Sequence, residues 1–90
     1  MAAQAYDTAV ARGKICENDT HDDVFFGILE ELREFREASE SAPSVHVPEL
    51  TEAEEELVDV YICCLTELHR RVPDVERAVK LKLDYNKTRR

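Results

Sequence analysis

Two pairs of acidic residues stand at a spacing that would let them act together. Glu31 and Glu34, and again Glu56 and Asp59, are three residues apart. On a helix, residues at i and i+3 lie on the same face. Four carboxylates that converge cannot all stay ionised without compensation, so either several are protonated or a cation lies among them. If a cation is present, all-oxygen ligation suits Mg²⁺ or Mn²⁺ better than zinc, which favours nitrogen and sulfur ligands.

Helices must position these pairs, and the sequence marks where they begin and end. Thr51 with Glu54 three residues later is the pattern of a capping box, and either Asp22 or Asp23 is suited to cap an earlier helix. Antiparallel packing of the second and third helices would set the two acidic pairs at nearly the same height. The predicted helices are about Ala2 to Lys14 (ending near Gly13), from after Asp23 to about Ser39, Thr51 to about Arg71, and Val75 towards Arg90, with Pro43, Pro48 and Pro73 breaking the chain between them.

Length and composition favour one helical domain spanning residues 1–90. The chain has a mass of 10.4 kDa and contains only two Gly and three Pro, too few turn-forming residues for a many-stranded β protein. We therefore expect an all-α fold, an antiparallel bundle of about four helices, because short connections favour antiparallel neighbours. The apolar residues of the third helix cover more than half of its circumference, which one neighbour cannot bury, and this predicts a subunit interface.

Charge, apolar stretches and cysteine content each argue against particular partners or locations. Twenty acidic residues against twelve basic ones give a formal charge of −8, which argues against DNA or RNA binding, since a phosphate backbone needs a basic surface. No apolar stretch approaches the roughly 20 residues that span a bilayer, and the N-terminus lacks the features of a signal peptide, so we expect no membrane association. Three cysteines are too few for a secreted disulfide framework, and a cytoplasmic location is expected.

The last predicted helix carries the opposite charge. Its apolar face begins with Val75 and Val79 and continues as Lys82, Asn86 and Arg89. Residues 80–90 contain five bases and one acid. Beside a carboxylate–metal cluster, Lys and Arg would supply charge, and Asn a hydrogen bond, for phosphate oxygens. The alternative is a basic helix end that merely complements the helix dipole.

Three segments together resemble a known family. EELRE (residues 30–34) resembles the EExxE motif of the MazG-like, all-α nucleoside triphosphate pyrophosphohydrolases, and ELVD (56–59) resembles their ExxD motif. LKLDYNKTR (81–89) resembles their closing K-x-x-Y-N-x-x-R segment. Each motif alone is common on acidic helices, whereas the ordered set of three is fairly specific.

The resemblance implies Mg²⁺-dependent cleavage of an NTP or dNTP to the monophosphate and pyrophosphate, by a helical domain that completes its site as a homodimer or homotetramer. It implies that Glu30 belongs to the motif without necessarily contacting metal, and it assigns the remaining roles residue by residue. The metal ligands would be Glu31, Glu34, Glu56 and Asp59, and the phosphate-binding residues Lys82, Asn86 and Arg89.

Two functions remain open on these grounds. In the enzymatic hypothesis, Glu31 or Glu34 orients the attacking water or takes its proton. The alternative is a non-catalytic, acidic helical module for oligomerisation or interaction, which should show no Mg²⁺-dependent stabilisation. A di-iron carboxylate bundle is disfavoured because it needs Glu-x-x-His pairs, and the nearest candidates, Glu67 and His69, have the wrong spacing.

Overall fold

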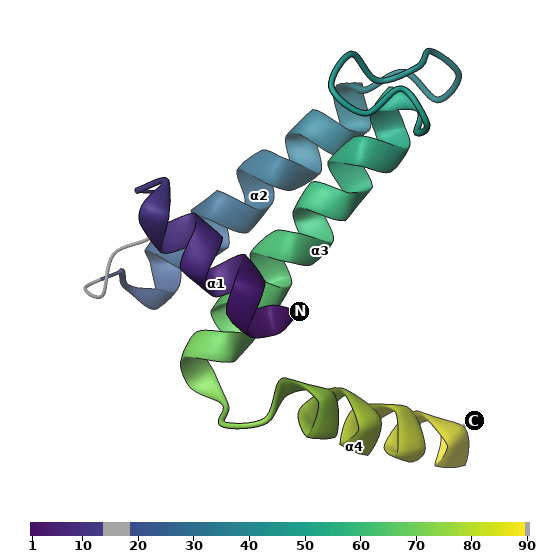
Figure 1. The fold of residues 1–90 in the computed structure, drawn as a ribbon. Helices are drawn as coiled ribbons and strands as arrows, with labels where there is room; N and C mark the ends of the chain where they lie inside the picture. Colours follow the sequence, from purple (N-terminus) through teal and green to yellow (C-terminus); the bar gives the residue numbers. More distant parts are fainter. Residues whose placement is uncertain (14–18, 90) are drawn as a thin grey trace.

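The chain folds as four helices, as the sequence predicts. The structure, a computed structural model, describes residues 1–13 and 19–89, and within these ranges it contains no regular strand, only an isolated bridge between Pro43 and Thr51. The all-α class is therefore confirmed. The helices are α1 (Ala2–Ala11), α2 (His21–Glu37), α3 (Glu52–Arg71) and α4 (Val75–Thr88) (Figure 1).

Helix α2 begins earlier than predicted. Thr20, rather than Asp22 or Asp23, is its N-cap, and the helix starts at His21. The Asp23 amide donates to Thr20 Oγ1 over 3.1 Å, while the Thr20 amide donates to Asp23 Oδ2 over 2.8 Å. This reciprocal pairing satisfies two backbone donors at once, which neither aspartate could do alone as the cap.

The predicted start of α3 is confirmed. Thr51 Oγ1 accepts the Glu54 amide over 3.1 Å, and Glu54 Oε1 accepts the Thr51 amide over 2.8 Å. The end of the helix at Arg71 also agrees with the prediction. Asp74 caps α4, and its Oδ1 accepts the Arg77 amide.

Two helices end before the predicted residues. Helix α1 ends at Ala11, and Gly13 follows with φ 69°. That left-handed conformation is accessible to glycine at little cost and lets the Gly13 amide bond Val10 O at 3.0 Å. Helix α2 ends at Glu37 because Ala38 is already extended. Residues 14–18, which include the predicted end of the first helix at Lys14, and Arg90 lie outside the described residues.

The loop between α2 and α3 fixes the register of the helix pair. Ser44 is buried (2% exposed), and its Oγ donates to the Glu55 carboxylate while accepting the amides of His46 and Val47. The Ser39 amide donates to Glu52 Oε2 over 3.1 Å. These contacts tie the end of α2 to the first turn of α3, so the acidic pairs of the two helices meet at the same height.

Loss of the α3 cap should destabilise the fold without touching the acidic pairs. Replacing Thr51 with Ala removes the hydroxyl that accepts the Glu54 amide, and we expect the free energy of unfolding to fall by about 1 kcal/mol in urea titrations. Thr88→Ala, an exposed change at the end of α4, is the matched control and should stay within about 0.5 kcal/mol of the unaltered chain. Equal losses in both variants would contradict the assigned role of the cap.

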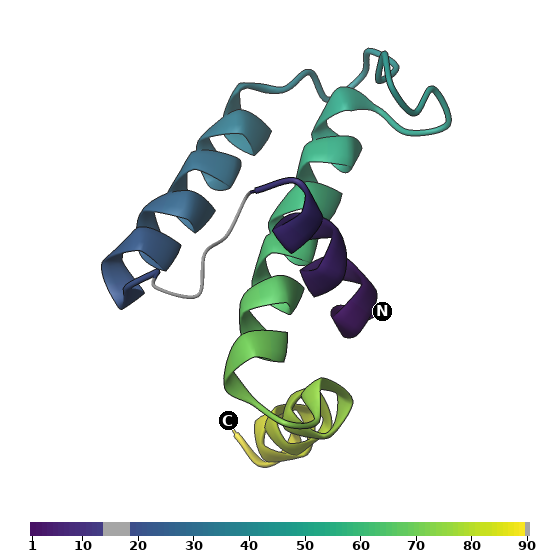
Figure 2. The same ribbon diagram turned by 60° about the vertical axis from the view of Figure 1, so that its left-hand side comes forward.

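Helices α1 and α4 occupy different positions relative to the α2–α3 pair. In both views α1 lies against α3, and the Tyr6 and His69 rings approach to 5.0 Å between centroids (Figures 1 and 2). Helix α4 leaves the C-terminal end of α3 and points away, so the expectation that it packs as an antiparallel neighbour is wrong. Only its first residue, Val75, is buried on that helix.

The described residues form a small core for so apolar a sequence. Leu65 and Val75, which are 6% and 8% exposed, are the only buried apolar residues in the described part, whereas many large apolar side chains on the four helices are exposed. Within that part, no helix combines the length and apolar character needed to cross a membrane.

Candidate functional site: an acidic cluster between two helices

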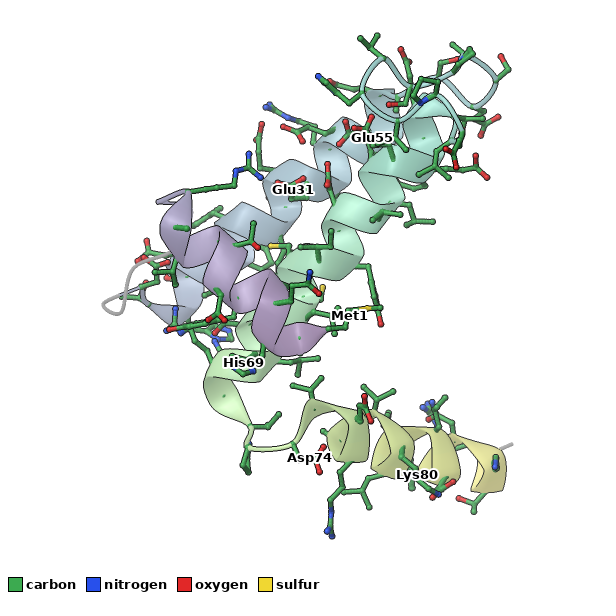
Figure 3. All side chains as sticks on the ribbon, in the orientation of Figure 1. Met1, Glu31, Glu55, His69, Asp74 and Lys80 are labelled. Carbon is green, nitrogen blue, oxygen red and sulfur yellow. The ribbon has the colours of Figure 1, made fainter. Side chains whose placement is uncertain are left out.

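Three of the four predicted carboxylates converge between α2 and α3. One oxygen from each of Glu31, Glu56 and Asp59 lies within 4.8 Å of the others. Glu31 comes from the middle of α2, and its side chain is seen beside α3 in Figure 3. This spacing is compatible with three oxygens that share one divalent cation.

Glu34 joins the other three. Its carboxylate is close enough to Glu31 and Glu56 to raise the pKa of both side chains. The i, i+3 spacing within each helix and the register fixed by the loop therefore bring together all four acidic residues that the sequence singles out.

The electrostatic environment of the cluster favours either a proton or a cation. Burial raises the pKa of Glu31, and repulsion by Glu34 and Asp59 raises it further. Burial likewise raises the pKa of Glu56, again with repulsion by Asp59 and Glu34. Both shifts show that the ionised form is disfavoured here when no positive charge compensates.

One oxygen of the cluster is left without a partner. Glu56 Oε2 is buried and accepts no hydrogen bond from the described residues. A buried acceptor without a donor typically costs about 1–3 kcal/mol, and more when it is charged. A cation is the group that would satisfy such an oxygen, so the residues present fit Mg²⁺ or Mn²⁺, both of which take carboxylate ligands.

A cavity of about 320 Å³ adjoins the cluster on the side of the α2–α3 loop. Five of its eight lining residues are acidic, and two of these, Glu34 and Glu56, belong to the cluster. The other lining residues are Glu37, Ala38, Val45, His46, Glu52 and Glu55. The small side chain of Ala38 helps to leave this space open in front of the carboxylates.

The predicted phosphate-binding residues are not with the carboxylates. Lys82 and Asn86 are exposed on α4, and Arg89 is exposed at its C-cap. Helix α4 points away from the cluster (Figures 1 and 3). Arg89 Nη1 donates to Asn86 Oδ1 over 3.2 Å, and Lys82 Nζ lies 4.8 Å from the centroid of the Tyr85 ring. Within one chain, the structure therefore gathers the acidic half of the predicted site and leaves the basic half apart.

The sequence pattern did not reveal the residues that support the cluster from the loop. The Glu55 carboxylate accepts a hydrogen bond from the Ser44 hydroxyl, and Glu55 Oε1 lies 3.4 Å from His46 Nδ1. No spacing rule links Ser44 to Glu55, because their contact depends on the path of the loop. Cys63, one turn beyond Asp59, is half-buried near Glu31, and burial raises the pKa of its thiol.

Comparisons with family models, with curated proteins and with solved structures find no match to this chain.

Proposed function

We propose that this chain is a Mg²⁺-dependent nucleoside triphosphate pyrophosphohydrolase of the MazG-like type, with Mn²⁺ as a possible substitute for Mg²⁺. The observation that carries the proposal is the convergence of Glu31, Glu34, Glu56 and Asp59 around a buried, unpartnered carboxylate oxygen. The ordered motifs on α2, α3 and α4 support it from the sequence. The proposal includes a homodimer or homotetramer acting on an NTP or dNTP in the cytoplasm.

The four carboxylates would hold the metal, and the bound ion would polarise phosphoryl oxygens and lower the pKa of water. Glu31 and Glu34 are the residues best suited to orient the attacking water or accept its proton, because they lie one turn apart on α2 at the cluster and because burial and neighbouring carboxylates raise the pKa of Glu31. The cluster is open to substrate through the adjoining cavity, which Glu34 and Glu56 line.

Lys82, Asn86 and Arg89 would bind the phosphates and stabilise the charge on the departing pyrophosphate. The negative charge of the whole chain does not oppose a polyanionic substrate, since bound divalent ions reverse the sign of the local field.

The second candidate is a non-catalytic helical interaction module. The observation in its favour is the extent of exposed apolar surface on α2, α3 and α4. Such a module needs no metal, so Mg²⁺ should leave its thermal stability unchanged, whereas an ion that binds the folded state stabilises it.

The proposed activity is tested most directly with a panel of the eight common NTPs and dNTPs. We expect at least one of them to yield pyrophosphate and the monophosphate in equal amounts when Mg²⁺ or Mn²⁺ is present, and none to do so with EDTA. Absence of pyrophosphate from all eight substrates with both metals would contradict the enzymatic proposal.

A further inference from the structure

The cavity beside the α2–α3 loop is a space that the metal chemistry does not use. Residues of α2, of the loop and of α3 line it. Its volume of about 320 Å³ lies at the lower end of the roughly 300–1,000 Å³ typical of small-molecule sites, which suits one ring system rather than a whole nucleotide. Glu34 and Glu56 belong both to its walls and to the carboxylate cluster. A nucleotide whose phosphates meet the metal can therefore place its base in this cavity.

The charge of the walls determines which part of a nucleotide fits. Like charges brought together cost several kcal/mol, so acidic walls away from the metal repel phosphates and leave the cavity to an uncharged group. An ionised carboxylate only accepts hydrogen bonds, so that group should carry N–H donors. Glu52 and Glu55 already accept hydrogen bonds from residues between α2 and α3. Glu37, exposed in the last turn of α2, lines the same cavity and is the best placed acceptor for a ligand.

His46 adds a flat surface to the same cavity. Its Nδ1 lies 3.4 Å from Glu55 Oε1, and its backbone amide donates over 3.2 Å to the hydroxyl of Ser44, which is buried. Glu55 itself belongs to the first turns of α3, at the loop end of the helix pair (Figure 3). The imidazole is thus held at two points while 83% of its side chain is exposed. Histidine rings stack on bases, and such stacking holds a base without reading its identity.

We propose that this cavity binds the base of the nucleotide substrate and selects bases with an exocyclic amino group, an assignment that rests on the proposed function. His46 stacks on the base, and Glu37 accepts a hydrogen bond from the amino group, as carboxylates do from the 4-amino group of cytosine. Uracil and thymine carry a carbonyl oxygen at that position, so two acceptors would face each other and neither would be satisfied. The substrates are therefore cytosine, adenine or guanine nucleotides rather than those of uracil or thymine.

The selection is tested with dCTP and dUTP, whose bases differ in the group at position 4. We expect kcat/KM of the unaltered chain to be at least about 10-fold higher for dCTP. In Glu37→Gln the ratio should fall close to one, because an amide can donate to the carbonyl of uracil as well as accept from cytosine. Glu40→Gln makes the same charge change at an exposed residue outside the cavity and should keep the ratio. A ratio near one in the unaltered chain, or an undiminished ratio in Glu37→Gln, would overturn the proposal.

The role of His46 is tested by removing and restoring its ring. We expect His46→Ala to raise KM about 10-fold for dCTP and dUTP alike, with little change in kcat, because stacking does not distinguish the two bases. His46→Phe keeps a flat ring and should restore most of the affinity, although it cannot pair with Glu55. An unchanged KM in His46→Ala, or a His46→Phe variant no better than His46→Ala, would contradict the stacking.

The nucleosides cytidine and uridine separate this proposal from the proposed function, because they carry no phosphate and need no metal. In nuclear magnetic resonance titrations, we expect millimolar cytidine to shift the signals of Val45 and His46 to saturation and uridine to shift them much less. Such shifts in a chain that hydrolyses no nucleotide would defeat the proposed function but not the base pocket. Hydrolysis that does not discriminate between dCTP and dUTP would defeat the base pocket alone. Equal shifts by both nucleosides, or none by either, would likewise overturn it.

Discussion

We expect Glu56→Gln to reduce the proposed release of pyrophosphate by at least about 100-fold while leaving the helical circular dichroism unchanged. The amide keeps the size of the side chain but removes the charge of a carboxylate that lies with Glu31 and Asp59 and has one unpartnered buried oxygen. Even changes to residues that only orient the metal ligands typically cost about 10–100-fold in metal affinity or activity, and the loss of a ligand should cost more. Asp59→Asn is expected to behave in the same way.

The matched control is Glu30→Gln. Glu30 adjoins Glu31 in sequence, but its Oε1 pairs with Arg33 at 2.6 Å on the exposed side of α2. The charge change is identical, so we expect activity within a few-fold of the unaltered chain. If Glu56→Gln retained turnover, or if Glu30→Gln lost as much, the assigned ligand set would be wrong.

The stability of the metal-free protein should fall as the pH rises from about 5 to 7.5. The folded state raises the pKa of Glu31 and Glu56, so it holds these protons more tightly than the unfolded chain does. Their contribution is therefore complete below the unfolded value of about 4.3 and is lost as the pH rises through the folded pKa values. For a domain of this size, each kcal/mol lost lowers the melting temperature by about 4–8 °C.

A saturating divalent cation should remove most of this pH dependence, because it replaces the protons as the compensating charge. At a concentration 100-fold above the dissociation constant, it would add about 2.7 kcal/mol of stability. The Glu31→Gln/Glu56→Gln double variant is the control and should melt at a nearly constant temperature across the same range, with or without Mg²⁺. A melting temperature of the unaltered, metal-free chain that rises steadily from pH 5 to 7.5 would contradict the assignment of these two carboxyls. The pKa of Asp23 is lowered, so this group changes the stability of the fold only in more acidic solution.

The convergence of the carboxylates could be anticipated from sequence because it depends mainly on local rules. The i, i+3 spacing places each pair on one helix face, and the Thr51–Glu54 capping box fixes where α3 begins. The start of α2 was harder to locate, since Thr20 and both aspartates are good caps and only the reciprocal geometry with Asp23 decides among them.

The position of α4 could not be obtained from local rules. Pro73 and Asp74 determine where the helix begins, but the direction in which it leaves α3 depends on tertiary contacts that no local pattern specifies. The connection is short, which favours antiparallel packing, yet within one chain Val79 and Leu83 stay exposed. The sequence therefore identifies an apolar face on α4 but does not determine the direction of the helix.

The central claim, that Glu31, Glu34, Glu56 and Asp59 share a divalent cation, is tested most directly by electron paramagnetic resonance of Mn²⁺. We predict that the unaltered chain at pH 7.5 reduces the sharp signal of free Mn²⁺ and that this binding saturates at a fixed number of ions per chain. Excess Mg²⁺ should compete for the site and restore the signal. The Asp59→Asn variant should leave the free signal undiminished. The claim would be contradicted if the unaltered chain did not reduce the free Mn²⁺ signal, or if the Asp59→Asn variant reduced it equally.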